Sequence, residues 1–141
     1  MFNVYYFVDL GLRNARLNFR QSEPAHLMEN VIYNELRVRG FNVDVGIVPI
    51  VLRDAEGKQK RIQQEIDFVC NLGSKKYYIQ SAYRMPDEEK IRQEEASLRR
   101  VDDSFKKIIV LGQDILVKRN EAGITTMGIY DFLLNPDSLD L

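Results

Sequence analysis

The sequence has little of the chemistry that builds disulfides or zinc sites. Its single cysteine, Cys70, has no partner within the chain, which fits a reducing compartment and excludes a cysteine-based zinc site. With His26 as the single histidine, we expect neither a structural nor a catalytic zinc ion.

The chain also lacks a strong net charge and a long apolar run. Lys and Arg total 20 against 21 Asp and Glu, so the net charge is -1 and any DNA contact must come from a local patch. Every apolar run is far shorter than the ~20 residues that cross a bilayer, and the N-terminus has no signal-peptide pattern. We therefore expect a soluble, cytoplasmic protein with no membrane partner.

What is present suffices for one domain. The 141 residues are 45% hydrophobic, enough for a core, and no repeat, low-complexity tract or linker divides them. Residues 1–23 are predicted to continue from an upstream region, with a strand at 4–8 and a short helix at 10–19 that Asp9 caps. Residues 24–141 are predicted to form the main domain.

Hydrophobic periodicity predicts an α/β fold with a central mixed sheet. Met28, Ile32 and Leu36 recur at helical spacing before Gly40, which stops the helix. Pro49 is expected to limit the first strand, because proline cannot donate to a ladder, so this strand should be bulged or at an edge of the sheet near that point. The predicted elements are helix 24–39, an antiparallel meander of strands 43–47, 62–70 and 77–83, helix 86–100, strand 106–111, a C-terminal hairpin of strands 115–118 and 124–130, and helix 131–134.

Two of these strands bring Asp67 and Gln80 side by side. Metal-dependent hydrolysis of a phosphodiester needs acidic oxygens to hold Mg²⁺ and a cation or base to position water. Here the paired strands offer one carboxylate and one neutral amide.

The order helix, three strands, helix, strand resembles the PD-(D/E)XK, or restriction-endonuclease-like, superfamily of nucleases. That resemblance implies a helix-one glutamate at Glu29, a strand-two aspartate at Asp67 and a third ligand at Gln80, with Mg²⁺ as the metal they would hold. The superfamily's lysine, two residues after the third ligand, is replaced by Ala82.

A narrower resemblance covers nearly the whole chain. Residues 7–13, 27–36, 65–69 and 78–83 are similar to the uncharacterised C-terminal domain of a family of prokaryotic AAA-type ATPases. The resemblance implies an upstream ATPase domain as partner. This chain contains no Gly-x-x-x-x-Gly-Lys-Ser/Thr loop, so ATPase activity would lie outside it.

The two replacements weaken the expected chemistry. An amide in place of a carboxylate removes roughly 8 kcal/mol of gross attraction to a divalent ion at ~4 Å and an effective dielectric of ~20. Loss of the lysine removes a cationic donor, and such donors are typically worth about 10²- to 10³-fold in rate. Arg84, or Lys75 or Lys76 at the preceding turn, could substitute for it, although arginine is a poor proton-transfer group.

Each candidate residue also has a purely structural interpretation. Glu29 could be solvated or salt-bridged, and Glu35 paired with an arginine. Asp67 could be held by a backbone N–H or by Arg84, and Gln80 could simply satisfy buried polar groups.

Three functions remain open from the sequence. The first is a non-catalytic recognition or assembly module of an ATPase, and the second a weak Mg²⁺-dependent endonuclease with a displaced cation. The third is a homo-oligomerisation domain. DNA contacts, where present, are expected from basic residues that otherwise are merely solvated: Arg53, Lys58, Lys60, Arg61, Lys75 and Lys76.

Overall fold

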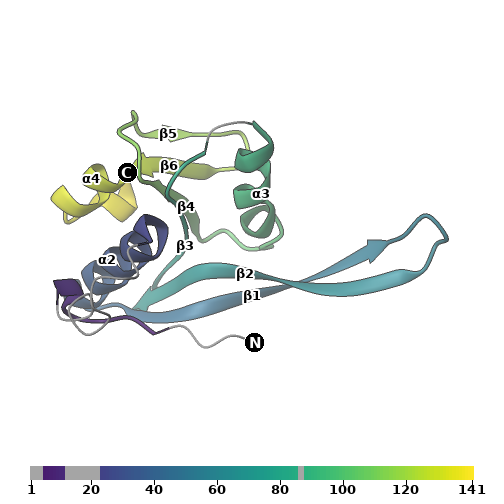
Figure 1. Cartoon of the computed structure of the whole chain (residues 1–141), viewed down its shortest axis with the longest axis horizontal. Coiled ribbons are helices and arrows are strands. Elements are labelled where there is room, and N and C mark those ends of the chain that lie inside the picture. Colours follow the sequence, from purple (N-terminus) through teal and green to yellow (C-terminus); the bar gives the residue numbers. More distant parts are fainter. Residues whose placement is uncertain (1–4, 12–22, 86–87) are drawn as a thin grey trace.

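The computed structural model describes residues 5–11, 23–85 and 88–141, and it shows an α/β fold with a six-stranded mixed sheet (Figure 1). The predicted α/β class with a central mixed sheet is therefore confirmed. The elements are α2 (Pro24–Val38), β1 (Asn42–Arg53), β2 (Gln59–Leu72), β3 (Lys75–Ala82), α3 (Glu88–Arg99), β4 (Lys106–Leu111), β5 (Lys118–Arg119), β6 (Ile124–Gly128), α4 (Ile129–Leu134) and a 3-10 helix (Ser138–Asp140).

The sheet has the strand order β1-β2-β3-β4-β6-β5. Strands β1, β2 and β3 form the predicted antiparallel meander, whereas β3, β4 and β6 run parallel and β5 returns antiparallel beside β6. Helix α3 connects β3 to the parallel β4, as a crossover between parallel strands requires. The predicted C-terminal hairpin is β5 and β6.

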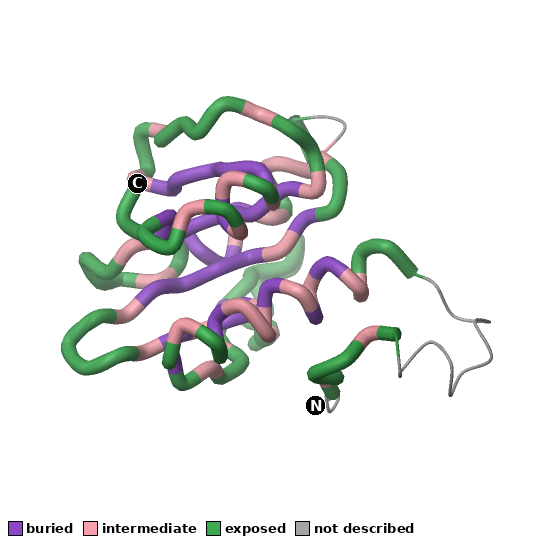
Figure 2. The backbone as a smooth tube through the Cα atoms, turned by 90° about the vertical axis from the view of Figure 1, so that its left-hand side faces the viewer, coloured by how far each residue is buried: buried purple, intermediate pink, exposed green. Residues whose placement is uncertain are grey.

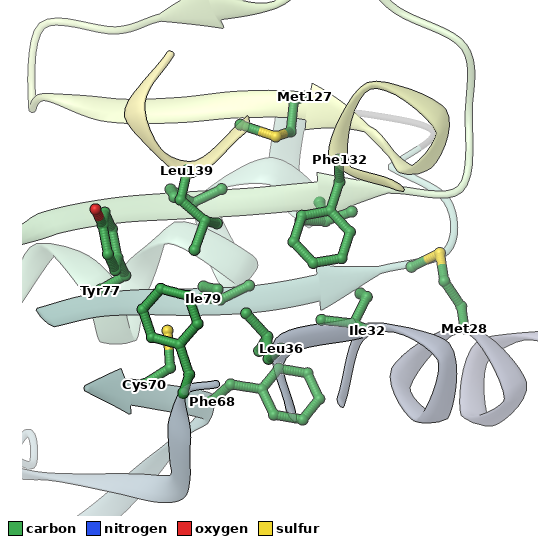
Figure 3. Packing of buried hydrophobic residues seen from close by; sticks show 13 residues of the cluster. Met28, Ile32, Leu36, Phe68, Cys70, Tyr77, Ile79, Met127, Phe132 and Leu139 are labelled. Atoms are coloured by element: carbon green, nitrogen blue, oxygen red, sulfur yellow. The ribbon is translucent and has the colours of Figure 1, made fainter. Parts of the chain in front are cut away.

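Helices cover both faces of the sheet. The stripe Met28, Ile32 and Leu36 of α2 packs on one face together with Phe132 of α4 (Figure 3). Leu98 of α3 packs on the other face. The central strands between these layers are buried along most of their length (Figure 2). Burial on both faces explains why β4 reads as a continuous apolar run.

Arg39 joins the two helices that share a face. It lies at the C-cap of α2, where its guanidinium pairs with Glu35 at 3.0 Å, which confirms the predicted arginine partner of Glu35. The same group donates hydrogen bonds to the carbonyl oxygens of Phe132 and Asn135 and to the Ser138 hydroxyl. These bonds satisfy the carbonyls that follow α4 and fix the C-terminal segment on α2.

Strands β1 and β2 extend beyond the rest of the sheet as a two-stranded ribbon (Figure 1). Pairing between β2 and β3 stops at Phe68 opposite Ile79, whereas β1 and β2 stay paired to Arg53 opposite Gln59. The prediction that the first strand ends near Pro49 was therefore wrong, whereas the prediction that the strand lies at an edge of the sheet there is confirmed. Because β1 is an edge strand, Pro49 can pair with Gln63 and leave its missing N–H on the open side.

Other boundaries shift by a few residues. The strand predicted at 115–118 is reduced to Lys118–Arg119, and the strand predicted to reach Tyr130 ends at Gly128, where α4 begins two residues early. No strand forms at residues 5–8, while Leu10 and Gly11 are helical. Residues 4, 12–19, 86 and 87, on which parts of the expected N-terminal elements and the start of the second helix fall, lie outside the described residues.

None of the helices in the described ranges is long and apolar enough to span a membrane.

Candidate functional site

A β-bulge places Asp67 in β2. Asp44 pairs with Val69 and Gly46 pairs with Ile66, so Val45 of β1 faces two residues of β2, Asp67 and Phe68. As a result Ile66 packs on the α3 face of the sheet and Phe68 on the α2 face. A Cβ at position 46 would lie 2.7 Å from Cγ2 of Val69, so the bulge needs glycine there.

Asp67 and Gln80 meet where β2 and β3 separate. The Asp67 N–H donates to Oε1 of Gln80 at 2.8 Å, and the Ser81 N–H donates to Oδ2 of Asp67 at 2.8 Å. Two side chains thus replace the backbone ladder just beyond the last paired residues. The predicted adjacency of Asp67 and Gln80 is confirmed, as is the interpretation that a backbone N–H holds Asp67.

The amide of Gln80 is hydrogen-bonded within the protein through both of its N–H groups and through its oxygen. Besides accepting from Asp67, it donates through Nε2 to the Ser97 hydroxyl at 2.7 Å and to the Glu65 carbonyl at 3.3 Å. The residue is 6% exposed. These bonds match the structural interpretation, in which glutamine satisfies buried polar groups.

Ala82, at the position of the missing lysine, lies in an apolar environment. It is 4% exposed and packs in the cluster of the α3 face with Leu98 and Leu111. A lysine here would need to bury its ammonium or push α3 away. The packing is therefore adapted to the alanine.

Glu29 and Asp67 form an acidic pair with elevated pKa values. Burial, followed by the charges of Asp67 and Glu94, raises the pKa of Glu29 to about 7. Burial raises the pKa of Asp67 to about 6, with Glu94 and Glu65 adding to the rise and the Ser81 N–H opposing it. Both carboxyl groups are therefore more easily protonated than usual, because burial disfavours their charged forms. Nδ1 of His26 lies 4.0 Å from Oε2 of Glu29.

Glu94 of α3 is a member of this environment that sequence reasoning missed. Its charge raises the pKa of both Glu29 and Asp67, and its Oε1 lies 2.9 Å from Nζ of Lys90. Nothing in the sequence distinguishes it from the other charged residues of α3, because only the crossover brings that helix beside the bulge.

The arrangement does not fit a bound Mg²⁺. Within residues 5–11, 23–85 and 88–141, no group of three His, Cys, Asp or Glu side chains is placed to hold a metal ion. The oxygen of Gln80 that would be a ligand already accepts from Asp67. A metal ion would have to share this oxygen with the Asp67 N–H, within hydrogen bonds that join β2, β3 and α3.

The candidate substitute cations lie elsewhere. β3 ends at Ala82, and the exposed Arg84 lies beyond the strand with its guanidinium 5.6 Å from the Tyr83 ring centroid. Lys75 and Lys76 are at the opposite end of β3, roughly 13–17 Å from Gln80 at ~3.3 Å per residue. Lys76 lies over the Tyr78 ring.

An N-terminal segment covers the acidic pair from the α2 side. Asn30 accepts from the Phe7 N–H and donates to the Phe7 carbonyl, which ties the segment to α2. Tyr6 then stacks on Tyr33 at 4.6 Å between ring centroids and packs against Phe68. Its pKa is raised by burial and by the charges of Glu29 and Asp67. This aromatic cover is partial: it contributes to the burial that raises both pKa values, while Asp67 still lines a cavity of about 270 Å³ with Tyr6 and Tyr33.

Four of the predicted nucleic-acid contacts gather near the tip of the ribbon. Arg53, Lys58, Lys60 and Arg61 are exposed around a turn in which Asp54 accepts from the N–H groups of Glu56 and Lys58. Lys75 and Lys76 are in the other turn, between β2 and β3, with Lys75 4.0 Å from Asp140. The six cations therefore form two separate groups.

Comparison with known proteins gives one similarity to report. No protein family matches the chain, and no solved structure matches it. A Haemophilus influenzae (strain ATCC 51907 / DSM 11121 / KW20 / Rd) protein described as an uncharacterized protein is 30% identical over 131 residues. The match covers 92% of this chain but 28% of that relative, so the chain spans little more than a quarter of the relative's length.

Proposed function

We propose that this chain is a non-catalytic module with a restriction-endonuclease-like fold, which acts in DNA or partner binding as the C-terminal domain of an AAA-type ATPase. The observation that carries the non-catalytic part is the occupation of Gln80. Its amide bonds to Asp67, Ser97 and Glu65, so the pair at the centre of the fold holds β2, β3 and α3 together.

The element order supports the fold assignment. Helix α2, the meander of β1 to β3, helix α3 and the parallel β4 follow one another as the superfamily resemblance implies. The charge of Asp67 also contributes to the raised pKa of Glu29, and both carboxyl groups contribute to the raised pKa of Tyr6. The longer relative is consistent with a further domain, since nearly three-quarters of its length lies outside the match.

DNA binding is proposed to use the tip of the ribbon. Four neutralised phosphates correspond to a slope of about -3.6 in log K against log salt for duplex DNA. Lys58→Ala with Lys60→Ala should make this slope shallower by about 2 and weaken binding to all sequences alike. Fluorescence anisotropy of a labelled duplex across a salt series measures it.

The matched control is Arg92→Ala with Arg100→Ala, which removes one exposed cation from α3 and one directly after its end. It should leave the slope within about 0.5 of the parent. If the two double variants lost DNA affinity equally, the attraction would be unspecific and the ribbon tip would have no special role. No binding at low salt would remove DNA from the proposal.

The alternative function is a weak Mg²⁺-dependent DNA endonuclease with a displaced catalytic cation. The observation in its favour is the proximity of the Glu29 and Asp67 carboxyl groups, together with the exposed Arg84 after β3. It requires Gln80 to give up its bond to Asp67, and it requires divalent-ion-dependent strand cleavage that Asp67→Ala abolishes.

A further inference from the structure

We propose that one face of the β1–β2 ribbon is a contact surface for a second copy of this chain, related by a two-fold axis. This surface, the open ribbon face, is defined by three pairs of directly opposed residues. They are Ile47 with Glu65, Pro49 with Gln63, and Val51 with Arg61.

These six side chains share one face because directly opposed residues of an antiparallel pair point the same way, and the face repeats every second residue. The intervening residues, Val48 and Ile50 with Gln64 and Ile62, form the other face. That face is covered, with Ile50 only 2% exposed. The open ribbon face, in contrast, exposes 44% of Ile47 and 54% of Val51.

Apolar and polar side chains form two separate columns on the open ribbon face. Its β1 column is apolar, whereas its β2 column is polar with Arg61 at one end and Glu65 at the other. Neither Arg61 nor Glu65 has an ion-pair partner among the residues described. An apolar row beside two unpaired opposite charges is typical of a contact surface.

This pattern is complementary to itself. The pair Pro49–Gln63 is its centre, with Arg61 two residues to one side of Gln63 and Glu65 two residues to the other. When two ribbons stack face to face about a two-fold axis through that centre, Arg61 of each copy lies opposite Glu65 of the other. The apolar columns then cover one another, as an isologous contact requires.

Other occupants fit less well. Nucleic acid would attract Arg61, but it would be repelled by Glu65 and would leave the apolar column without a partner. Strand addition along the β1 edge is hindered by Pro49, which has no N–H to donate. A second copy satisfies both charges and the apolar column together.

The contact is small. From Arg61 to Glu65 the face measures only about 13 Å at ~3.3 Å per residue, so the dimer belongs to the weak class of interfaces. It also leaves Arg53, Lys58 and Lys60 outside the contact. Arg61 belongs to both proposed surfaces, so dimerisation is measured without DNA, and DNA binding is tested at Lys58 and Lys60.

Sedimentation equilibrium without DNA tests the proposal. From about 1 to 500 µM, the mass should rise from 16.5 kDa toward twice that value. Arg61→Glu alone and Glu65→Arg alone should each weaken the dimer by at least about 10-fold, because each places like charges opposite one another. The double variant R61E/E65R should recover dimerisation to within about 3-fold, because it exchanges the charges and restores the pairing.

The matched control is the exchange of Arg92 and Glu88, which are exposed on α3 and should not affect the mass. A mass of 16.5 kDa at every concentration would overturn the proposal. The proposal would also be overturned if both single variants associated as tightly as the parent. It would equally be overturned if the double variant failed to recover dimerisation. A monomer that still binds DNA would contradict only the dimer, whereas a dimer that binds no DNA would contradict only DNA binding.

Discussion

Replacing Gln80 by glutamate should lower the free energy of unfolding by about 2–4 kcal/mol near pH 8. The change introduces the acidic residue that the proposed relationship to metal-dependent nucleases would place at this position. In this chain it removes the NH₂ group that donates to Ser97 and to the Glu65 carbonyl, and it buries a charge beside Asp67. The loss should shrink near pH 5, where the buried carboxyl group is protonated.

Urea unfolding of Gln80→Glu measures this effect, with Gln93→Glu as the matched control. Gln93 is exposed on α3, so the same chemical change there should alter stability by no more than about 0.5 kcal/mol. If Gln80→Glu were as stable as the parent and bound Mg²⁺, the site would be a metal centre that one substitution restores. The structural assignment of Gln80 would then be wrong.

Asp67→Asn should stabilise the protein by up to about 3 kcal/mol near pH 8 and have little effect near pH 4. The pKa of Asp67 is about 6 in the folded chain, against a reference value of 3.8. The folded state thus binds the proton more tightly than the unfolded state. The stability from this group is fully present below its unfolded pKa and is lost as pH rises through about 6. Asparagine cannot ionise, and its oxygen can still accept from Ser81.

Urea unfolding of parent and Asp67→Asn at a series of pH values isolates this contribution as a difference. Asp44→Asn is the control, since Asp44 is exposed on the neighbouring strand and its variant should follow the parent within about 0.5 kcal/mol. Because the pKa of Glu29 is raised to about 7, ionisation of Glu29 should lower the stability of the parent further as the pH rises through that value. A variant less stable than the parent near pH 8 would mean that a cation holds Asp67 ionised.

The sequence predicts those parts of the fold whose residues carry a clear period. Helix α2 begins at Pro24 as expected, because its apolar stripe and the proline at the first turn agree. β4 was predicted with its observed bounds, since a strand buried on both faces is a continuous apolar run. The pairing of Asp67 with Gln80 followed from the turn between β2 and β3.

What the sequence could not give depends on tertiary position. Pro49 predicted an edge strand or a bulge, but how far β1 continues beyond Pro49 depends on its pairing with β2. The bulge at Asp67 is fixed by the pairing of Gly46 with Ile66, which no pattern within β2 records. Glu94 joins the acidic pair only because α3 crosses beside it, and strand parity could not place Arg84 once β3 ended at Ala82.

Incubation of supercoiled plasmid with the protein in Mg²⁺ or Mn²⁺ is the most direct test of the account. The parent, Asp67→Ala and Gln93→Ala should all leave the plasmid as intact as buffer alone, because Gln80 is committed to the fold and Ala82 supplies no cation. Nicking by the parent and by Gln93→Ala that depends on the divalent ion and is lost in Asp67→Ala would contradict the account, and would establish a working nuclease.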